Sequence, residues 1–138
     1  MEALLDKGLL ELGISLSAAQ QKQLETYWSE LALWNGKYGL VNASGEALVI
    51  KHFLDSFSAV PLLKTMTFDT ACDVGSGGGF PGLVLAVAFP DKKFTLIERS
   101  GKKYLGLRKS IKTKSHQLLQ KSSITQLLCR FLQLRRLL

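Results

Sequence analysis

The first half of the chain has the apolar spacing of amphipathic α-helices, with one apolar and one polar face. Residues 2–12 predict a short helix that Gly8 weakens and that ends near Gly13, since glycine is a poor helix former and commonly follows helix ends. A longer helix is predicted over residues 47–63, where Pro61 is suited to end it. The pattern therefore predicts an N-terminal helical region.

Between these two segments the sequence predicts its strongest helix. Ser17 and Gln20 have the spacing of a capping box, in which two residues bond reciprocally at a helix start. Apolar and aromatic side chains then recur at three- and four-residue steps along one face, namely Leu24, Tyr27, Trp28, Leu31 and Trp34. We interpret this stripe as core packing in preference to an aromatic surface on which bases stack.

The pattern changes in the second half of the chain. Residues 68–74 predict a short buried strand, residues 81–89 a helix, and residues 93–98 a second strand. A strand, a glycine turn, a helix and a strand form one βαβ unit, the beginning of a parallel sheet. The fold class is therefore α/β, with a helical region over residues 1–64 and the α/β unit over residues 65–108.

Length, composition and charge bound the class of protein. A chain of 138 residues with 46% hydrophobic side chains is the size of one domain. The net charge of +7 favours a nucleic-acid partner, but its distribution matters more than its total. Residues 1–98 contain seven Lys and Arg against eleven Asp and Glu, whereas residues 99–138 contain eleven basic residues and no acidic one.

Two cysteines, Cys72 and Cys129, have neither the spacing of a metal site nor the number of a disulfide framework, which is typical of a reducing, cytosolic protein. The longest apolar run, Leu83 to Phe89, is far shorter than the ~20 residues that span a bilayer. The N-terminus does not have the pattern of an export signal. We therefore expect a cytoplasmic protein with no membrane partner and no metal.

The stretch DVGSGGGFPG, residues 73–82, has five glycines in ten residues where the first predicted strand passes into the helix that follows. Glycines let a ligand approach the backbone, whose free N–H groups then point at it. A triphosphate-binding loop is disfavoured, because no Gly-Lys-Ser or Gly-Lys-Thr follows. Gly77, Gly79 and Gly82 do match the GxGxxG pattern of dinucleotide sites, and Glu98 lies about where an acidic residue binds the ribose.

Asp73 favours a different ligand. A carboxylate repels a pyrophosphate at close range but suits a ligand that carries a sulfonium and an ammonium group, which describes S-adenosylmethionine. The spacing Asp73-x-Gly75-x-Gly77-x-Gly79 resembles the first motif of the Rossmann-like methyltransferases, with Glu98 placed to accept hydrogen bonds from the ribose hydroxyls. The alternatives are a nicotinamide cofactor and a structural turn whose glycines only permit tight packing.

Further motifs extend the resemblance over roughly residues 10–108. The chain resembles the bacterial small-subunit ribosomal RNA guanine-N7 methyltransferases, the glucose-inhibited division protein B family, in the order and spacing of WNGKY (34–38), KHFLDS (51–56), DVGSGGGFPGLVLA (73–86), FTLIE (94–98) and SGKK (100–103). The resemblance implies a Rossmann-like, S-adenosylmethionine-dependent enzyme that methylates N7 of a guanine in small-subunit (16S) ribosomal RNA. Its partner would be that RNA or the assembling small subunit.

The resemblance also implies roles for individual residues. Gly75 and Phe80 fall on cofactor-contact positions of the family, and Gly77, Gly79 and Glu98 on the rest of the cofactor pocket. The chain departs from the family at residues 39–41, where Gly-Leu-Val stands in place of the common Asn-Leu-Thr, and we expect no polar contact from that segment.

The roles of two further groups of polar residues are less directly indicated by the motifs. His52 and Asp55 share a helix face and would suit a general base with its orienting carboxylate, but we favour structural hydrogen bonding for them. Guanine N7 carries an unprotonated lone pair, so we assign no catalytic acid or base. Arg99, Lys102 and Lys103, in a basic cluster that continues to residues 108–109, are candidates to bind RNA phosphates, and a solvated helix face is the alternative.

The sequence changes character from about Lys109 onward, where Gly, Pro, Asp and Glu are absent. We expect no further strands in residues 109–138, which leaves the predicted sheet truncated. We interpret this tail as the product of a reading-frame shift near residue 108, in preference to a basic amphipathic helix that docks on RNA, a membrane surface or another subunit. On that interpretation the isolated chain is poorly soluble or partly unfolded and has little or no activity. For the chain as a whole, the alternatives to a methyltransferase are a non-catalytic RNA-binding remnant and a nicotinamide-dependent oxidoreductase.

Overall fold

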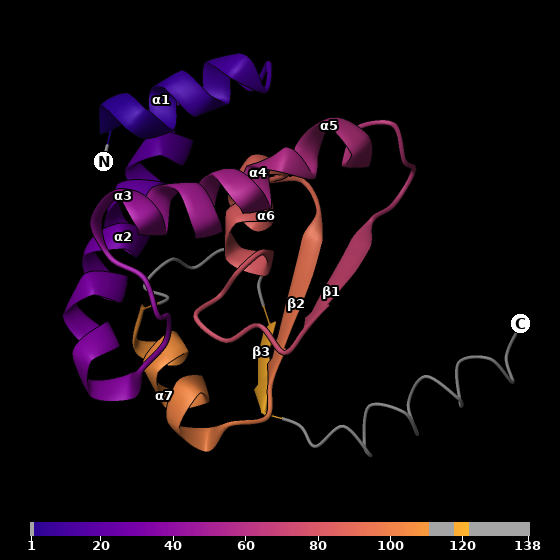
Figure 1. The fold of residues 1–138 in the computed structure, drawn as a ribbon. Helices are drawn as coiled ribbons and strands as arrows, with labels where there is room; N and C mark the ends of the chain where they lie inside the picture. Colours follow the sequence, from indigo (N-terminus) through magenta and orange to yellow (C-terminus); the bar gives the residue numbers. More distant parts are fainter. Residues whose placement is uncertain (1, 111–117, 122–138) are drawn as a thin grey trace, which may run out of the picture.

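The structure, a computed structural model, describes residues 2–110 and 118–121. Its elements in chain order are α1 (Glu2–Glu11), α2 (Ala18–Tyr38), α3 (Gly45–Leu48), the π-helix η1 (Val49–Leu54), α4 (Asp55–Ser58), α5 (Val60–Leu63), β1 (Thr70–Val74), α6 (Gly82–Ala88), β2 (Lys93–Glu98), α7 (Gly101–Ser110) and β3 (Leu118–Lys121). Helices α6 and α7 pack between the sheet and α2, so that α2 and the strands lie on opposite sides of them (Figure 1). None of the helices in this part of the chain combines the length and apolarity needed to cross a membrane.

The three strands form one parallel sheet in the order β1-β2-β3. In the register, Val74 at the end of β1 lies opposite Ile97, and Glu98 at the end of β2 lies opposite Lys121. The predicted βαβ unit is confirmed, and α6 and α7 supply the crossovers that parallel strands require. The expectation that residues 109–138 hold no strand is wrong for β3, a four-residue strand that the composition of the tail does not mark. Residues 111–117 and 122–138 lie outside the described residues, so our interpretation of the tail stays a prediction.

Helix α2 begins as predicted. The Ser17 hydroxyl accepts a hydrogen bond from the Gln20 N–H, and the Gln20 side chain accepts one from the Ser17 N–H, which completes the capping box. The helix ends where Gly39 adopts a left-handed conformation and donates its N–H to the Asn35 carbonyl. Both ends of α2 are therefore fixed by local hydrogen bonds.

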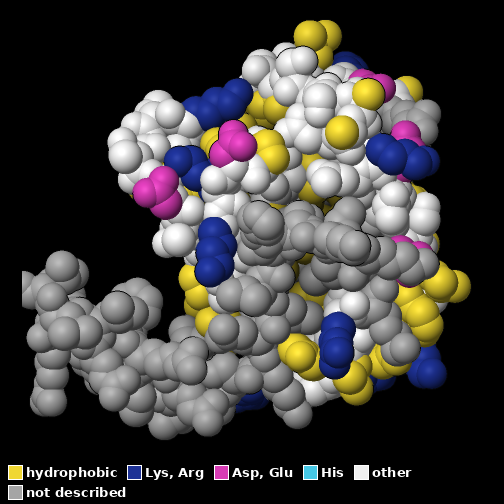
Figure 2. Space-filling view, turned by 180° about the vertical axis from the view of Figure 1, so that it is seen from behind, with side chains coloured by type: hydrophobic (Ala, Val, Ile, Leu, Met, Phe, Trp, Pro, Cys, Tyr) yellow, Lys and Arg dark blue, Asp and Glu magenta, His cyan; other side chains and the backbone are white. Residues whose placement is uncertain are grey.

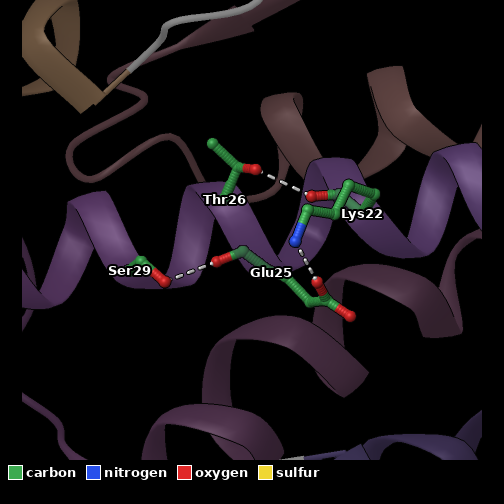
Figure 3. A network of polar contacts seen from close by, with 4 residues as sticks. All are labelled: Lys22, Glu25, Thr26 and Ser29. Atoms are coloured by element: carbon green, nitrogen blue, oxygen red, sulfur yellow. Dashed lines mark hydrogen bonds and ion pairs between the residues drawn. The ribbon is translucent and has the colours of Figure 1, made fainter.

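The outer face of α2 carries short polar contacts between residues of the helix itself (Figure 3). Lys22 and Glu25 form an ion pair with 2.9 Å between Nζ and Oε2, and the hydroxyls of Thr26 and Ser29 donate to carbonyls one turn earlier. An exposed pair of this kind contributes little to stability. The helix is oriented instead by its opposite face, the apolar stripe, which is buried.

The stripe enters the core, as predicted. Leu24, Tyr27 and Leu31 are buried, and the flanking tryptophans of the stripe are half-buried against the same cluster. The Tyr27 ring lies 5.7 Å from that of Phe53 and 5.4 Å from that of Phe80, centroid to centroid. Helix α2 thus contacts both η1 and the loop that follows β1.

The helix predicted over residues 47–63 is present in a modified form. The helical path runs from Gly45 to Leu63 with a π-helical turn over η1, and Pro61 lies in the first turn of α5 rather than at the helix end. Proline is tolerated there because backbone N–H groups in the first turn of a helix have no partner within the helix, so the N–H that proline lacks is not missed. The π turn brings Phe53 inward, where its ring packs edge-on against Phe80 at 5.1 Å.

Strand β1 is less buried than its apolar composition predicts. Thr70, Cys72 and Val74 are exposed, with Val74 at 54%, while the alternate residues face α6. A groove of about 340 Å³ runs along this strand and is lined mainly by apolar side chains. Parallel sheets are normally covered on both faces, but the face of β1 away from α6 is exposed, whereas Ile97 on the same face of β2 is buried.

Two glycines allow a matched test of the α2–α7 packing. A Cβ on Gly106 would lie 2.7 Å from Tyr38 Cβ and Cγ, whereas a Cβ on Gly36 would meet no described atom within 4 Å. Although alanine favours helices, we expect Gly106→Ala to lower the free energy of unfolding by about 1 to 3 kcal/mol through overpacking. Gly36→Ala should raise it by up to about 1 kcal/mol. Urea unfolding of both variants checks this, and a stabilised Gly106→Ala protein would contradict the packing.

Candidate functional site

The glycine loop of residues 75–81 joins the carboxyl end of β1 to α6 and is anchored on the neighbouring strand. The N–H groups of Gly75 and Ser76 both donate to the Ile97 carbonyl, at 2.8 and 3.2 Å. The φ angles of Gly75, Gly77 and Gly79 are +89°, +56° and +105°. Residues with a side chain adopt such positive φ angles only with strain. The sequence requirement for glycine at these three positions is therefore conformational.

The glycines of the loop differ in what surrounds them. A Cβ on Gly75 would meet no described atom within 4 Å, and one on Gly77 would meet only the Gly75 carbonyl oxygen at 3.9 Å. A Cβ on Gly79 would instead lie 2.6 Å from Leu83 Cδ1, and Gly78 is equally confined. The first two glycines thus face open space, and the later ones permit tight packing. Tight packing therefore explains the later glycines, and the approach of a ligand to Gly75 and Gly77 stays a prediction.

Glu98 closes the site from the end of β2. Its Oε2 accepts a hydrogen bond from the Gly77 N–H at 2.8 Å, and its Oε1 accepts one from the Ser100 N–H at 2.6 Å. The side chain is only 6% exposed, so these charge-assisted bonds compensate for its burial. The sequence placed Glu98 beside the glycine loop correctly, but did not reveal that its carboxylate binds the loop itself.

Asp73 also bonds to backbone, at the start of α6. Its Oδ2 accepts a hydrogen bond from the Gly82 N–H at 3.0 Å. Burial raises the pKa of Asp73 and the nearby charge of Glu98 adds to this, while the Gly82 hydrogen bond opposes it. Two carboxylates therefore bind backbone N–H groups of this segment, Glu98 at Gly77 and Asp73 at Gly82.

Ser76 was not singled out in the sequence. Its side chain is 1% exposed, and its hydroxyl has no hydrogen-bond partner among the described residues. A buried hydroxyl without a partner is uncommon in folded proteins. Nothing in the local pattern marks this residue, because a serine between glycines is ordinary turn composition.

Within the described residues His52 and Asp55 accept hydrogen bonds through their backbone carbonyls, from Ser56 and Ser58, and the structural side-chain hydrogen bonding that we favoured is not formed. The His52 ring lies 4.9 Å from the Phe80 ring, and Asp55 is exposed on the following turn. Burial lowers the pKa of His52, and the smaller effect of Asp55 opposes this. The π turn accounts for the difference, because the i and i+3 spacing assumed a regular α-helix. His52 therefore packs on the loop through Phe80.

The candidate RNA contacts lie where β2 passes into α7. Arg99 and Lys102 are exposed and Lys103 is half-buried. On the face of the molecule seen in Figure 2, the visible Lys and Arg side chains are scattered among apolar and uncharged ones. Within the described ranges no group of three or more His, Cys, Asp or Glu side chains is arranged to hold a metal ion.

Sequence reasoning also missed the contacts that the N-terminal region makes with the loop. The Tyr27 hydroxyl donates to the Gly78 carbonyl, and Leu40 and Val41 lie against Gly78. Tyr27 was assigned to core packing, which is correct for its ring. Only the fold brings its hydroxyl to a residue 51 positions away in the chain.

The arrangement defines a class of protein. A parallel sheet, a glycine loop that leads into a helix after β1, and an acidic residue at the end of β2 are the features of the Rossmann-like nucleotide-binding domains. The sequence model of the GidB family, described as rRNA small subunit methyltransferase G, matches residues 20–123. The chain belongs to the GidB family. The match continues past Arg108 and includes β3.

Curated relatives agree with the family model. The chain is 46% identical over 98 residues to the ribosomal RNA small subunit methyltransferase G of Ectopseudomonas mendocina, an alignment that covers 70% of this chain and 45% of the relative. The protein of that name from Pseudomonas aeruginosa is 44% identical over 72% of the chain and 46% of its own length, and the one from Alteromonas mediterranea is 39% identical over 82% and 53%. The chain spans about half the length of these relatives.

The raised pKa of Asp73 gives a pH-dependent prediction. A group whose pKa is higher in the folded state stabilises the fold below its unfolded-state pKa, and this contribution is lost as pH rises through the folded-state pKa. We therefore expect Asp73→Asn, which keeps an acceptor for the Gly82 N–H, to gain stability relative to the parent as pH rises from about 3 to 7.

Urea unfolding across this pH range measures the effect. Asp91→Asn, an exposed substitution in the turn before β2, controls for the loss of one negative charge. Identical pH profiles for Asp73→Asn and Asp91→Asn would contradict the assigned burial of Asp73.

Proposed function

We propose that this chain binds S-adenosylmethionine at the glycine loop and serves methyl transfer to N7 of a guanine in small-subunit (16S) ribosomal RNA. The observation that carries the proposal is the pairing of two open glycines, Gly75 and Gly77, with the carboxylate of Glu98. The names of the relatives, rRNA small subunit methyltransferase G, support the choice of RNA.

The loop fits this cofactor chemically. Open space above Gly75 and Gly77 leaves room for an adenosyl group close to the backbone, where a side chain would intrude. Asp73 and Glu98 provide negative charge beside a ligand that carries sulfonium and ammonium groups. The buried Ser76 hydroxyl leaves hydrogen-bonding capacity within the same loop. Gly79 and Phe80, proposed as contacts from the resemblance, support the site through packing.

Glu98 is proposed as the ribose ligand. Each carboxylate oxygen can accept more than one hydrogen bond, so Glu98 can bind ribose hydroxyls while it keeps the Gly77 or Ser100 N–H. An acidic residue at the end of β2 suits the ribose of either cofactor, but the carboxylate of Asp73 beside the loop would repel the phosphates of a dinucleotide. This comparison favours S-adenosylmethionine over a nicotinamide cofactor.

The chemistry requires little of the protein beyond placement. When bound, the cofactor supplies an activated methyl group on a positively charged sulfur. The guanine N7 lone pair forms the new bond to the methyl carbon as the carbon–sulfur bond breaks, so no proton has to be removed before attack. The charge passes from sulfur to the methylated base. We therefore assign the residues of the loop to alignment, and we assign no general base.

We place the RNA contact at Arg99, Lys102 and Lys103. These residues follow Glu98 directly, so that phosphates bound there would lie next to the cofactor site. Phosphate contacts of this kind fix the position of an RNA without reading its sequence. The assembling small subunit offers the same phosphates. We propose that this takes place in the cytoplasm, where ribosomal RNA is assembled.

Calorimetric titration of the full chain with S-adenosylhomocysteine and, separately, with NAD tests the cofactor. We expect heat of binding with S-adenosylhomocysteine alone. Gly77→Val should abolish it, because valine would be strained at φ +56° and would occupy the open space. Gly45→Val is the matched control, since Gly45 has φ +53° and equally open surroundings but lies far from the loop in the chain.

Three results would separate the alternatives. Tight binding of NAD without a signal from S-adenosylhomocysteine would favour an oxidoreductase. Binding of small-subunit RNA with no signal from either small molecule would favour a non-catalytic RNA-binding protein. Equal loss of binding in Gly77→Val and Gly45→Val would show that backbone strain alone, and not the cofactor loop, explains the effect.

A further inference from the structure

Tyr27 links helix α2 to the glycine loop. Its side chain is 6% exposed, and its hydroxyl donates a hydrogen bond to the carbonyl of Gly78, the central residue of the Gly77–Gly79 run. The ring orientation is fixed on two sides by Phe53 and Phe80. Because Tyr27 lies in the middle of a helix with both ends capped, its hydroxyl is held at a defined position.

The loop needs such an external contact because it has few of its own. Glycine-rich backbone has more conformations to lose on ordering than any other sequence. The internal bonds of the loop are those from the Gly79 and Phe80 N–H groups to the Ser76 carbonyl. Gly78 is buried, so its carbonyl would be costly to leave without a partner.

The opposite side of Gly78 is confined by the segment that follows α2. A Cβ on Gly78 would lie 2.8 Å from Val41 Cγ1 and 3.3 Å from the Leu40 carbonyl oxygen. Val41 is itself fixed, because its N–H donates to Asn35 Oδ1 at 2.9 Å. Helix α2 and its C-terminal extension thus hold Gly78 by one hydrogen bond and by apolar contact.

Burial raises the pKa of Tyr27 above its ordinary value, and the negative charge of Asp73 acts in the same direction. The phenol is therefore protonated at neutral pH and acts as a donor. A protonated hydroxyl is what an acceptor such as the Gly78 carbonyl requires. Phenylalanine at this position would keep the ring packing and remove only the donor.

We propose that Tyr27 is a positioning residue for the cofactor site, which holds the backbone of residues 75–79 in the conformation that binds the ligand. The inference rests on the proposed cofactor and goes beyond it, because it makes the N-terminal helical region a working part of the site. Tyr27 acts through Gly78 and need not touch the ligand.

The test compares Tyr27→Phe with Tyr38→Phe in the full chain. Tyr38 lies on the same helix, and its hydroxyl makes no hydrogen bond within the described part of the chain. Two measurements are made: the dissociation constant for S-adenosylhomocysteine, and amide hydrogen exchange of residues 75–80 without ligand. We expect Tyr27→Phe to weaken binding roughly tenfold, as loss of a buried hydrogen bond does, and to speed exchange in the loop. Tyr38→Phe should change neither.

The two measurements separate failure of this inference from failure of the proposed function. If the parent binds and Tyr27→Phe binds equally well with unchanged loop exchange, Tyr27 does not position the loop, although the cofactor assignment stands. If the parent does not bind S-adenosylhomocysteine, the proposed function fails, and so does the assignment of Tyr27 to a cofactor site. Faster exchange throughout the protein would indicate a general structural role and would also overturn the inference.

Val41→Ala provides a second variant if Tyr27→Phe does not fold. It removes the apolar contact on the other side of Gly78 at a half-buried position. Weaker binding and faster loop exchange in this variant would support positioning by α2 and its extension, whereas unchanged values would contradict it.

Discussion

The candidate site depends on how the glycine loop, residues 75–81, is held in one conformation although few of its residues have side chains. Besides the first hydrogen bonds of α6, the glycine loop is fixed by residues outside it: the Ile97 carbonyl at the end of β2, the Glu98 carboxylate beside it, and the Tyr27 hydroxyl from α2. Each is a hydrogen bond to loop backbone in a buried or half-buried setting, where such bonds are hardest to replace with water. Loss of this anchoring would leave the loop free to adopt many conformations.

This constraint explains why the helical and α/β regions pack into one unit. Helix α6 needs the apolar stripe of α2 to cover it, and the loop before α6 needs Tyr27 and the segment around Val41. The face of β1 that carries Cys72 and Val74 has no such cover among the described residues. The packing that covers the site therefore comes from the helical side of the sheet, and it adds to the anchors from β2.

The sequence predicted those features that depend on local pattern. The capping box at Ser17, the buried stripe of α2 and the strand-loop-helix-strand order were all readable, because capping and periodicity act over a few residues. The motifs around the loop also identified the family. The π turn was not readable, so the shared helix face assumed for His52 and Asp55 did not apply. Strand β3 was missed because it has only four residues and no glycine, proline or acidic residue around it marks a turn. Contacts such as Tyr27 with Gly78 were out of reach, since they depend on how distant segments pack.

The most direct test of the account is to follow the backbone amides of the loop by nuclear magnetic resonance while S-adenosylhomocysteine is added. The amides of Gly77 and Ser100 are the best reporters, because both donate to Glu98, the residue proposed to bind the ribose. The account predicts that these two signals and that of Gly75 shift most, with saturation at one equivalent of ligand. Saturable binding that leaves all three signals unchanged would contradict it, because the ligand would then lie away from the glycine loop.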